Sequence, residues 1–213
     1  TGSAPAQAST RPSAPAAKPS TPAAKPSTPA GSAATAPSTS GPAVNELGQF
    51  AQSAYGQLLA KGEGGRHGYD AYNAGTLGVQ PDAKGRKLPK YSGSYQAATG
   101  RPITDMTIAE ILAASKGTGM DKARIFAAGK YQFVPDTLRG AAKEAGIPLD
   151  TKFTPEVQDM LFAAHLKRRA PSVYAYATGK SDRYTAKDWN TVAAEWRSMP
   201  TTSGGTYQDQ YAS

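Results

Sequence analysis

The sequence predicts a mostly α-helical domain of the α+β class, with a small glycine-rich lobe and a disordered segment in front of it. Apolar residues recur at helical spacing in several segments after residue 43, and residues that typically cap helices flank most of these segments. The stretch 76–95 is polar and rich in glycine, which interrupts the helical pattern. We therefore expect a helical body and an irregular or β-hairpin lobe.

Residues 1–42 differ in composition from the rest of the chain. They consist mainly of Pro, Ala, Ser and Thr, with three basic residues and no acidic or aromatic residue. The unit Ala-Ala-Lys-Pro-Ser-Thr-Pro occurs at 16–22 and again at 23–29. Such a segment buries too little apolar surface to offset its ordering entropy, so we predict a disordered linker or tail over 1–42 and one domain over 43–213. Because the chain begins at Thr1 and not at Met, we expect a processed product or the C-terminal part of a longer protein.

Charge and cysteine content narrow the classes of partner. The chain of 213 residues carries a formal net charge of +8, and the three basic residues of 1–42 leave +5 on the domain. A basic surface suits an anionic partner, but the Lys and Arg residues are scattered and form no stripe, so we expect no nucleic-acid partner. No apolar run approaches the ~20 residues of a membrane span. We expect a monomer without membrane insertion, and the absence of Cys excludes disulfides.

The expected helices follow from spacing and caps. Apolar residues at helical spacing predict a helix with one apolar face over 45–61, which ends at Gly62. Thr107 and Glu110 form a capping box that opens a helix to about residue 115. Thr154 followed by Pro155 starts a long helix. The full set of expected helices is 45–61, 107–115, 121–127, a helix after Pro135 that ends at Gly146, 154–169 and 185–198.

Two carboxylates follow the first expected helix. Glu63 stands among glycines at its C-terminal end, and Asp70 comes seven residues later in a Tyr-rich loop. Because the helix dipole disfavours a negative charge at that end, we expect a raised pKa for Glu63, which suits a general acid. The plainer alternatives are a solvated loop Glu and a loop-capping Asp.

The remaining polar motifs do not predict a binding, metal or cofactor site. Four basic residues at 84–90 (Lys84, Arg86, Lys87, Lys90) are more typical of a solvated loop than of a binding site. His67 and His165 stand in no cluster with ligand spacing, so we predict no metal site, and we expect His165 on a helix face. No phosphate-binding glycine loop and no nucleophile elbow is present, and we expect no cofactor.

Several of these motifs resemble the lysozyme-like superfamily of peptidoglycan-cleaving glycosidases. The pattern Gly129-x-x-Gln132-x-x-Pro135-x-Thr137 is similar to the Gly-Leu-Met-Gln block of lytic transglycosylases. Glu63-Gly64-x-Arg66, followed by Asp70 and Thr76, resembles the Glu, Asp and Thr triad of T-even-type phage lysozymes, with a Glu-to-Asp gap that is two residues shorter here. The span 50–207 resembles muramidase domains of phage lysins and related cell-wall-degrading effectors.

The resemblance implies a role for each matching residue. Glu63 would protonate the glycosidic oxygen, Asp70 would act on water or stabilise the oxocarbenium-like charge, and Thr76 would place the water. Tyr131 would offer a ring face to the sugar and Gln132 an amide to its N-acetyl group, with Tyr72 and Asn73 as further binding residues. From the sequence alone, Tyr131 could equally be a core aromatic, and Thr76 a turn residue.

Three functions therefore remain open at this point. The first is a muramidase that cleaves the β-1,4 bond between N-acetylmuramic acid and N-acetylglucosamine, and the second is a lytic transglycosylase that needs only the acid. The third is a non-catalytic peptidoglycan-binding or virion structural module. In each case the partner is the glycan strand of peptidoglycan, reached in the bacterial periplasm or cell wall by a virion-associated or secreted protein. A carrier protein or domain could be joined through residues 1–42.

Overall fold

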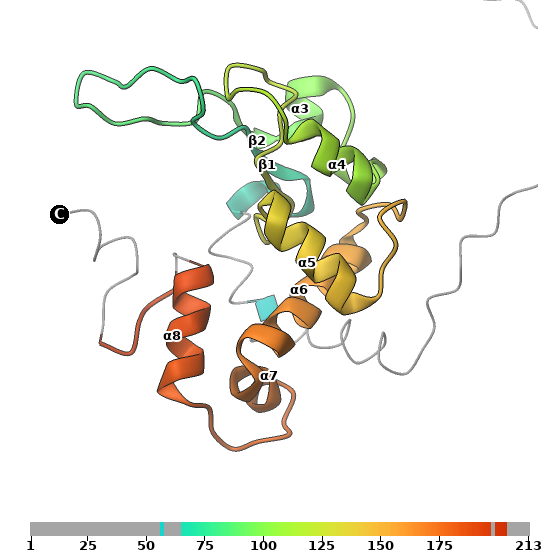
Figure 1. The fold of residues 1–213 in the computed structure, drawn as a ribbon, viewed down its shortest axis with the longest axis vertical. Coiled ribbons are helices and arrows are strands. Elements are labelled where there is room, and N and C mark those ends of the chain that lie inside the picture. Colours follow the sequence, from blue (N-terminus) through green and yellow to red (C-terminus); the bar gives the residue numbers. More distant parts are fainter. Residues whose placement is uncertain (1–55, 58–64, 197–198, 204–213) are drawn as a thin grey trace, which may run out of the picture. The chain divides into compact units, whose positions relative to one another are not determined.

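A computed structural model of the protein describes residues 56–57, 65–196 and 199–203 (Figure 1). Helices and a small antiparallel sheet make up this part of the chain, which confirms the predicted α+β class. In chain order the elements are η1 (Gly65–Asp70), β1 (Ala71–Asn73), β2 (Ser92–Ser94), α3 (Tyr95–Thr99), η2 (Ile103–Asp105), α4 (Ile108–Ala114), β3 (Ala127–Ala128), α5 (Pro135–Ala145), α6 (Pro155–Arg169), α7 (Pro171–Ala177) and α8 (Ala186–Glu195), with η marking 3₁₀ helices.

The sheet joins three segments that lie far apart in the sequence. Its strand order is β2-β1-β3, and both pairings are antiparallel. In the centre, Tyr72 of β1 lies opposite Gly93 on one side and Ala128 on the other. Beyond β3, the Gly129 N–H donates to the carbonyl of Ala71 at 2.8 Å. The segment that follows Glu63 in the sequence is thereby fixed beside the Gly129–Gln132 turn.

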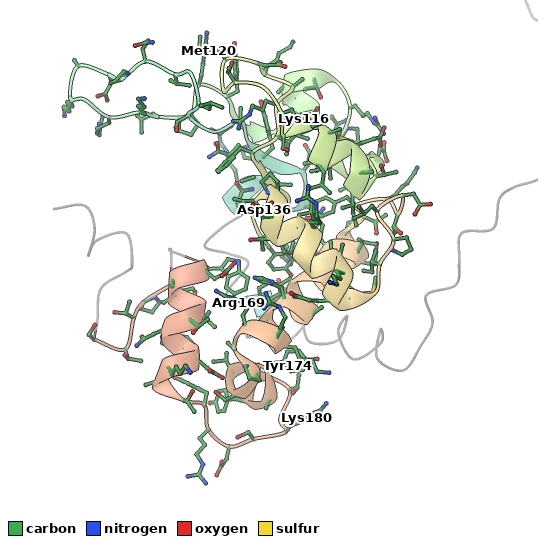
Figure 2. All side chains as sticks on the ribbon, viewed as in Figure 1. Lys116, Met120, Asp136, Arg169, Tyr174 and Lys180 are labelled. Carbon is green, nitrogen blue, oxygen red and sulfur yellow. The ribbon has the colours of Figure 1, made fainter. Side chains whose placement is uncertain are left out.

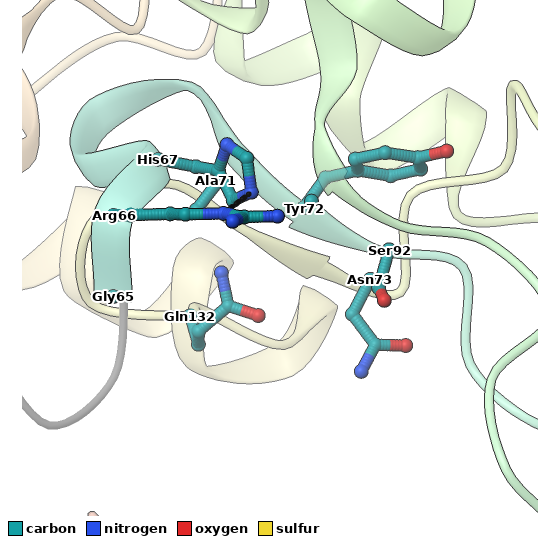
Figure 3. A pocket seen from close by; sticks show the side chains of 9 residues that line it. Gly65, Arg66, His67, Ala71, Tyr72, Asn73, Ser92 and Gln132 are labelled. Atoms are coloured by element: carbon teal, nitrogen blue, oxygen red, sulfur yellow. Dashed lines mark hydrogen bonds between the residues drawn. The ribbon is translucent and has the colours of Figure 1, made fainter.

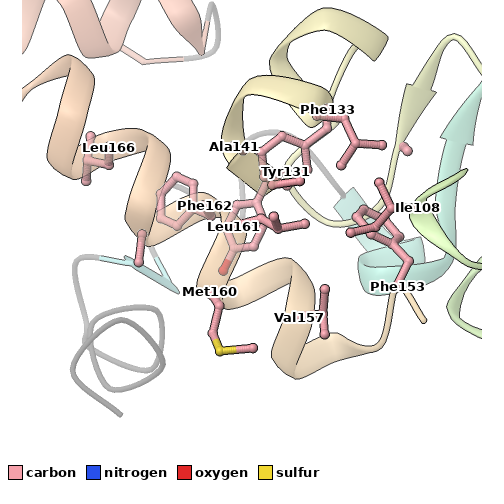
Figure 4. Packing of buried hydrophobic residues seen from close by; sticks show 14 of the residues in the cluster. Ile108, Tyr131, Phe133, Ala141, Phe153, Val157, Met160, Leu161, Phe162 and Leu166 are labelled. Carbon is pink, nitrogen blue, oxygen red and sulfur yellow. The ribbon is translucent and has the colours of Figure 1, made fainter. Parts of the chain in front are cut away.

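Helix α6 forms the centre of the helical body. It packs against α5, α7 and α8, and every residue from 157 to 166 is buried. Figure 4 shows Tyr131 and Phe162 at this centre. Their rings stack with a centroid distance of 4.0 Å, and the Phe162 ring meets that of Trp196 edge-on. A helix that is buried all round requires its polar residues to be paired, because an unpaired polar group in the core is costly.

The capping signals of α4, α5, α6 and α8 that were read from the sequence are confirmed. The Thr107 hydroxyl accepts from the Glu110 N–H, and the Glu110 carboxylate accepts from the Thr107 N–H, which is the predicted capping box of α4. The Thr154 hydroxyl caps α6 by accepting from the Val157 N–H, and Gly146 ends α5 in the left-handed conformation. Helix α8 starts after its Thr185 cap as expected, but it ends at Glu195, three residues before the predicted end.

The helix predicted over 121–127 is wrong. The chain there forms turns and then β3, because two backbone pairings replace helical ones: the Ile125 N–H donates to the Ala114 carbonyl, and Ala127 pairs with Asn73 of β1. The Arg124 side chain also leaves this segment to bind the carbonyls of Ala74 and Ser115. Tertiary partners therefore override a weak local helical preference.

Two sequence predictions concern residues outside the described part of the chain, and one helix of the structure was not predicted. The boundary at residue 42 and the helix over 45–61 lie outside the described residues, except that Gly56 and Gln57 are helical. Helix α7 was not predicted, because it starts directly after α6 and the sequence shows no gap between them. The two are separated by Ala170, whose φ of −140° and ψ of 66° break the helical path before Pro171 opens α7. None of the described helices is both long and apolar enough to cross a membrane.

The glycine-rich stretch is an irregular loop between β1 and β2, as expected (Figure 2). Its tip is closed by Asp82, whose carboxylate accepts from the backbone N–H groups of Lys84 and Arg86 and pairs with the Arg86 guanidinium at 2.8 Å. At its base the Gly119 N–H donates to the Leu77 carbonyl at 2.7 Å. The four predicted basic residues are all exposed, in keeping with a solvated loop.

We predict that Tyr72→Phe leaves the protein equally stable or stabilises it by up to about 1 kcal/mol. The Tyr72 side chain is buried, and its hydroxyl has no hydrogen-bond partner among the described residues. Removing a buried polar group that lacks a partner removes its desolvation cost. Urea denaturation measures the change, and Tyr95→Phe is the control, because the Tyr95 hydroxyl donates to the Ala123 carbonyl and its loss should destabilise. Destabilisation by Tyr72→Phe as large as that of the control would contradict the prediction.

Candidate functional site

A pocket of about 320 Å³ opens where η1, β1, β2 and the turn after β3 meet (Figure 3). This volume lies at the lower end of the range for small-molecule sites, and the pocket is open to solvent. Its lining residues come from three separate stretches of the chain: Gly65, Arg66, His67, Ala71, Tyr72, Asn73, Ser92, Gly93 and Gln132.

Gln132 stands in a backbone conformation that is rare for a residue with a side chain. Its φ is +49°, and it is the one described non-glycine residue at positive φ. The turn is held because the Gln132 N–H and its side-chain N–H₂ both donate to the Gly129 carbonyl, at 3.1 and 2.8 Å. A strained backbone of this kind is often found at functional sites. The amide oxygen of Gln132, which lines the pocket, has no partner among the described residues and can accept from a ligand.

Asn73 supplies a second amide. Its side-chain oxygen accepts from the Gly75 N–H at 2.6 Å, which fixes the orientation of the amide group. The nitrogen of that amide has no partner among the described residues, so it can donate to a ligand. Together, Asn73 and Gln132 offer one donor and one acceptor, which is the pairing that an N-acetyl group requires.

Arg66 and His67 form the opposite wall of the pocket (Figure 3). The Arg66 Nε–H donates to His67 Nε2 at 3.2 Å, so Nε2 carries the lone pair and the hydrogen of the neutral ring is on Nδ1. The imidazole in turn lies over Gly93, where a Cβ atom would come within 3.3 Å of Nε2.

The predicted catalytic residues do not all meet at this pocket. Glu63 lies outside the described residues, two positions before Gly65 in the sequence. The Asp70 carboxylate accepts three hydrogen bonds, from the Ser94 hydroxyl at 2.5 Å and from the N–H groups of Gln96 and Ile103 at 3.0 and 2.8 Å. It therefore ties η1 to α3 and η2 and does not line the pocket. Thr76 also lies outside the lining, in a turn where its carbonyl accepts from the Val79 N–H.

The two predicted tyrosines belong to the core. Tyr72 is among the residues that line the pocket, but its ring packs edge-on against Tyr95 and points away from the other lining side chains (Figure 3). Tyr131 is 2% exposed, and its hydroxyl donates to Asp159 at 2.7 Å. Burial, together with the Asp159 charge, raises the pKa of Tyr131 far above its usual range, so its hydroxyl stays a donor. Neither ring offers a free face to a sugar. Tyr131 and Gln132 do both line a separate cavity of about 70 Å³ beside Trp196.

Two neighbouring polar residues of α6, Gln158 and Asp159, bind both η1 and the turn after β3, the segments that carry the pocket walls. Gln158 is fully buried; its oxygen accepts from the Lys130 N–H at 2.9 Å, and its nitrogen donates to the Tyr69 carbonyl at 3.0 Å. Asp159 accepts from the hydroxyls of Tyr69 and Tyr131, and its carboxylate lies 3.9 Å from Lys130 Nζ. This polar brace connects η1 to the Gly129–Gln132 turn through α6.

Sequence reasoning missed the brace and most of the pocket wall. Gln158 and Asp159 were visible as polar residues between the apolar Val157 and Met160 of the predicted helix, which is a signal for buried pairing. Arg66 was noted only as part of the Glu63-Gly64-x-Arg66 pattern, and His67 only as a histidine without metal-ligand spacing. Ser92 and Gly93 carried no signal, because only the β1–β2 register brings them to the pocket.

His165 lies on α6 as expected, but it is buried between two carboxylates. Its Nδ1 is 3.3 Å from Glu144 of α5, and its Nε2 is 3.0 Å from Glu195 of α8. Arg168 also pairs with Glu144, and Arg169 pairs with Glu195. The hydrogen bond from His165 holds the pKa of Glu195 below its usual range, against the opposing effect of burial. This cluster joins three helices away from the pocket.

We predict that stability falls as the pH drops below about 4.5, with Glu195 as one contributor. An unfolded Glu takes up its proton near pH 4.3, whereas folded Glu195 holds its charge to lower pH. The stability it contributes is therefore present above the unfolded pKa and is lost as the pH falls through the folded pKa. Urea denaturation between pH 7 and 3 should show a shallower acid loss for Glu195→Gln than for the wild type. Asp182→Asn, at an exposed pair, is the control and should follow the wild type; equal slopes for all three proteins would contradict the assignment.

Comparisons with known proteins identify no relative of this chain: no protein-family model, no curated protein and no solved structure matches it.

Proposed function

We propose that this protein is a lysozyme-like glycosidase that cleaves the β-1,4 bond between N-acetylmuramic acid and N-acetylglucosamine in peptidoglycan, with Glu63 as the general acid. One observation carries the proposal: the pocket begins at Gly65, two residues after Glu63, and its lining includes the amides of Asn73 and Gln132. Covalent geometry limits the Glu63 Cα to roughly 8 Å from the Gly65 Cα, a distance that allows the carboxyl to reach a sugar in the pocket.

The chemistry assigned to each group is simple. Glu63 in its protonated form donates to the glycosidic oxygen as the bond to the anomeric carbon breaks, leaving oxocarbenium-like charge on the ring. Asn73 and Gln132 hold the N-acetyl group of the sugar by one donated and one accepted hydrogen bond. Residues 1–42 join the domain to a carrier, and the protein acts in the periplasm or cell wall.

The environment of Asp70 favours the lytic-transglycosylase form of this reaction. A hydrolase of this type needs a second carboxylate at the sugar. A transglycosylase uses the substrate's own 6-hydroxyl as nucleophile, and the hydroxyl proton passes to the Glu63 carboxylate, which has just protonated the leaving oxygen, as the 1,6-anhydro bond forms. The Asp70 carboxylate is occupied by three donors from Ser94, Gln96 and Ile103. None of the described residues that line the pocket is an Asp or Glu. The acid-only reaction can therefore proceed with Asp70 as it stands, whereas the two-carboxylate reaction would require the Asp70 carboxylate to leave its three donors and reach the sugar.

Mass spectrometry of peptidoglycan digests tests the proposal. We expect 1,6-anhydromuramic acid ends for a transglycosylase and reducing ends for a hydrolase. Glu63→Gln should lower the rate by at least about 100-fold, because a general acid commonly contributes 10²–10⁴-fold. Glu156→Gln makes the same chemical change at an exposed position of α6 and should keep the wild-type rate.

The remaining outcomes separate the alternatives. Asp70→Asn should keep most of the activity of the molecules that remain folded, measured per folded protein by circular dichroism. If Asp70→Asn abolishes turnover with the fold and thermal midpoint intact, the two-carboxylate hydrolase replaces the transglycosylase. If the wild type binds peptidoglycan and releases no product, the protein is the non-catalytic wall-binding module and the proposal is wrong.

A further inference from the structure

We propose that Arg66, held by His67, is a carboxylate-binding residue that makes the pocket prefer acidic glycans over neutral ones. The inference rests on the proposed function, since it concerns the same pocket, and it narrows the substrate to glycan strands that carry free carboxylates. Muramic acid offers such a group on its lactyl ether when the stem peptide is absent, and the stem peptide offers others when it is present.

The charge of the pocket wall supports this assignment. Arg66 and His67 are the basic residues among the described residues that line the pocket, and none of these described residues is an Asp or Glu. Asp70, the nearest described carboxylate along the chain, faces the Ser94 hydroxyl and the backbone of Gln96 and Ile103 instead. The proposed acid Glu63 is protonated in its working form and then carries no charge. A ligand in the pocket therefore meets a guanidinium without a competing carboxylate from the described lining.

The geometry of Arg66 suits a carboxylate. Its guanidinium uses the Nε–H for His67 at 3.2 Å, and the N–H groups of the two η nitrogens have no partner among the described residues. Those groups form the planar fork that binds a carboxylate through two parallel hydrogen bonds. Chitin-type glycans have no carboxylate and would leave the fork solvated.

The positioning of Arg66 depends on His67 and Gly93. An exposed arginine normally samples many rotamers, and ordering it costs free energy. Here the imidazole accepts from Nε on one side and lies over Gly93 on the other, where the missing Cβ leaves room for the ring. The β1–β2 register places Gly93 opposite Tyr72. The strand pairing therefore fixes the position of Gly93, and through His67 it fixes the position of the Arg66 guanidinium. His67 is therefore a positioning residue, and Arg66 makes the contact with the ligand.

The test compares three substrates: N-acetylglucosamine oligomers, glycan strands freed of stem peptides, and strands that keep them. We expect the wild type to prefer at least one acidic substrate over the neutral oligomer by about tenfold in kcat/KM, mainly through KM. Arg66→Gln should reduce that ratio to near one, and Arg66→Lys should give an intermediate ratio because a point charge replaces the fork. Arg183→Gln removes the same charge from an exposed site and should keep the wild-type ratio.

Salt provides a second readout that a structural defect would not produce. The wild-type preference should fall as ionic strength rises, because an exposed ion pair is screened, whereas the ratio for Arg66→Gln should not change with salt. A preference for stem-free strands identifies the lactyl carboxylate, and a preference confined to stem-bearing strands identifies the peptide. A ratio for Arg66→Gln within twofold of the wild type overturns the inference while leaving the proposed function intact.

Failure of the proposed function can be told apart from failure of this inference. If the wild type cleaves none of the three substrates, calorimetric binding at low salt replaces turnover as the measurement. Binding of acidic strands that is lost in Arg66→Gln and retained in Arg183→Gln would still support the carboxylate site. Equal binding of acidic and neutral strands by the wild type would overturn it.

Discussion

Gly129→Ala is expected to destabilise the protein by roughly 3 kcal/mol or more, the sum of a backbone and a packing penalty. Gly129 has a φ of +72°, a conformation that costs about 1–2 kcal/mol for a residue with a Cβ. A Cβ there would overlap the side-chain oxygen of Gln158 and would lie 2.7 Å from Gln158 Cδ and 2.8 Å from Phe153 Cε1. Both neighbours are fully buried and have no space to withdraw.

Gly179→Ala is the matched control for this substitution. Gly179 has the same φ of +72°, but a Cβ there would meet nothing within 4 Å. It should therefore cost only the backbone term of about 1–2 kcal/mol. Urea denaturation of both variants separates the two contributions. Equal losses for Gly129→Ala and Gly179→Ala would show that the contact with Gln158 relaxes freely and that the packing argument is wrong.

Asp159→Ala is expected to cost about 3–5 kcal/mol, the range for breaking a buried ion pair from one side. Asp159 is 2% exposed and accepts from the Tyr131 hydroxyl at 2.7 Å and from the Tyr69 hydroxyl at 3.0 Å. Its carboxylate also faces the ammonium of Lys130, which is itself buried. Removing it takes the acceptor from the buried Tyr131 hydroxyl and the facing carboxylate from the buried Lys130 ammonium.

Two further variants make this prediction specific. Asp159→Asn keeps one acceptor oxygen for the tyrosines and should cost less than the alanine variant. Asp136→Ala removes a carboxylate of 98% exposure from its pair with Arg139 at the start of α5 (Figure 2), and should cost less than about 1 kcal/mol. Thermal and urea denaturation measure all three. A loss for Asp159→Ala no larger than that for Asp136→Ala would mean that water replaces the carboxylate at no cost.

The helices could be predicted because their signals are local. Thr107 with Glu110, Thr154 with Pro155, and Gly146 each mark a helix boundary within four residues of sequence, and the structure uses all of them. The sheet could not be predicted, because its strands have two or three residues and depend on partners up to 56 positions away in the pairing of Tyr72 with Ala128. Strands this short lack a period that a sequence pattern could reveal.

Part of the pocket lining was predicted, because local motifs mark some of its residues. Gln132 and Asn73 were named from motifs, and both line the pocket. Tyr131 was named from the same motif, yet the chain direction that brings Gln132 to the surface turns its neighbour inward onto Phe162. Asp70 was read as chemistry because a carboxylate in a loop looks the same in sequence whether it faces a sugar or three donors. Only the positions of Ser94, Gln96 and Ile103 distinguish these cases.

The closed tip of the loop between β1 and β2 has a consequence for engineering the protein. Asp82 and Arg86 complete the tip with bonds inside the loop, while the Ala74 N–H binds the Tyr91 carbonyl at its base. The tip therefore depends on no residue of the pocket, and the pairing of β1 with β2 does not depend on the tip. A fluorescent label, an affinity tag or a new pair of chain ends could be introduced there, with the rest of the chain keeping its register.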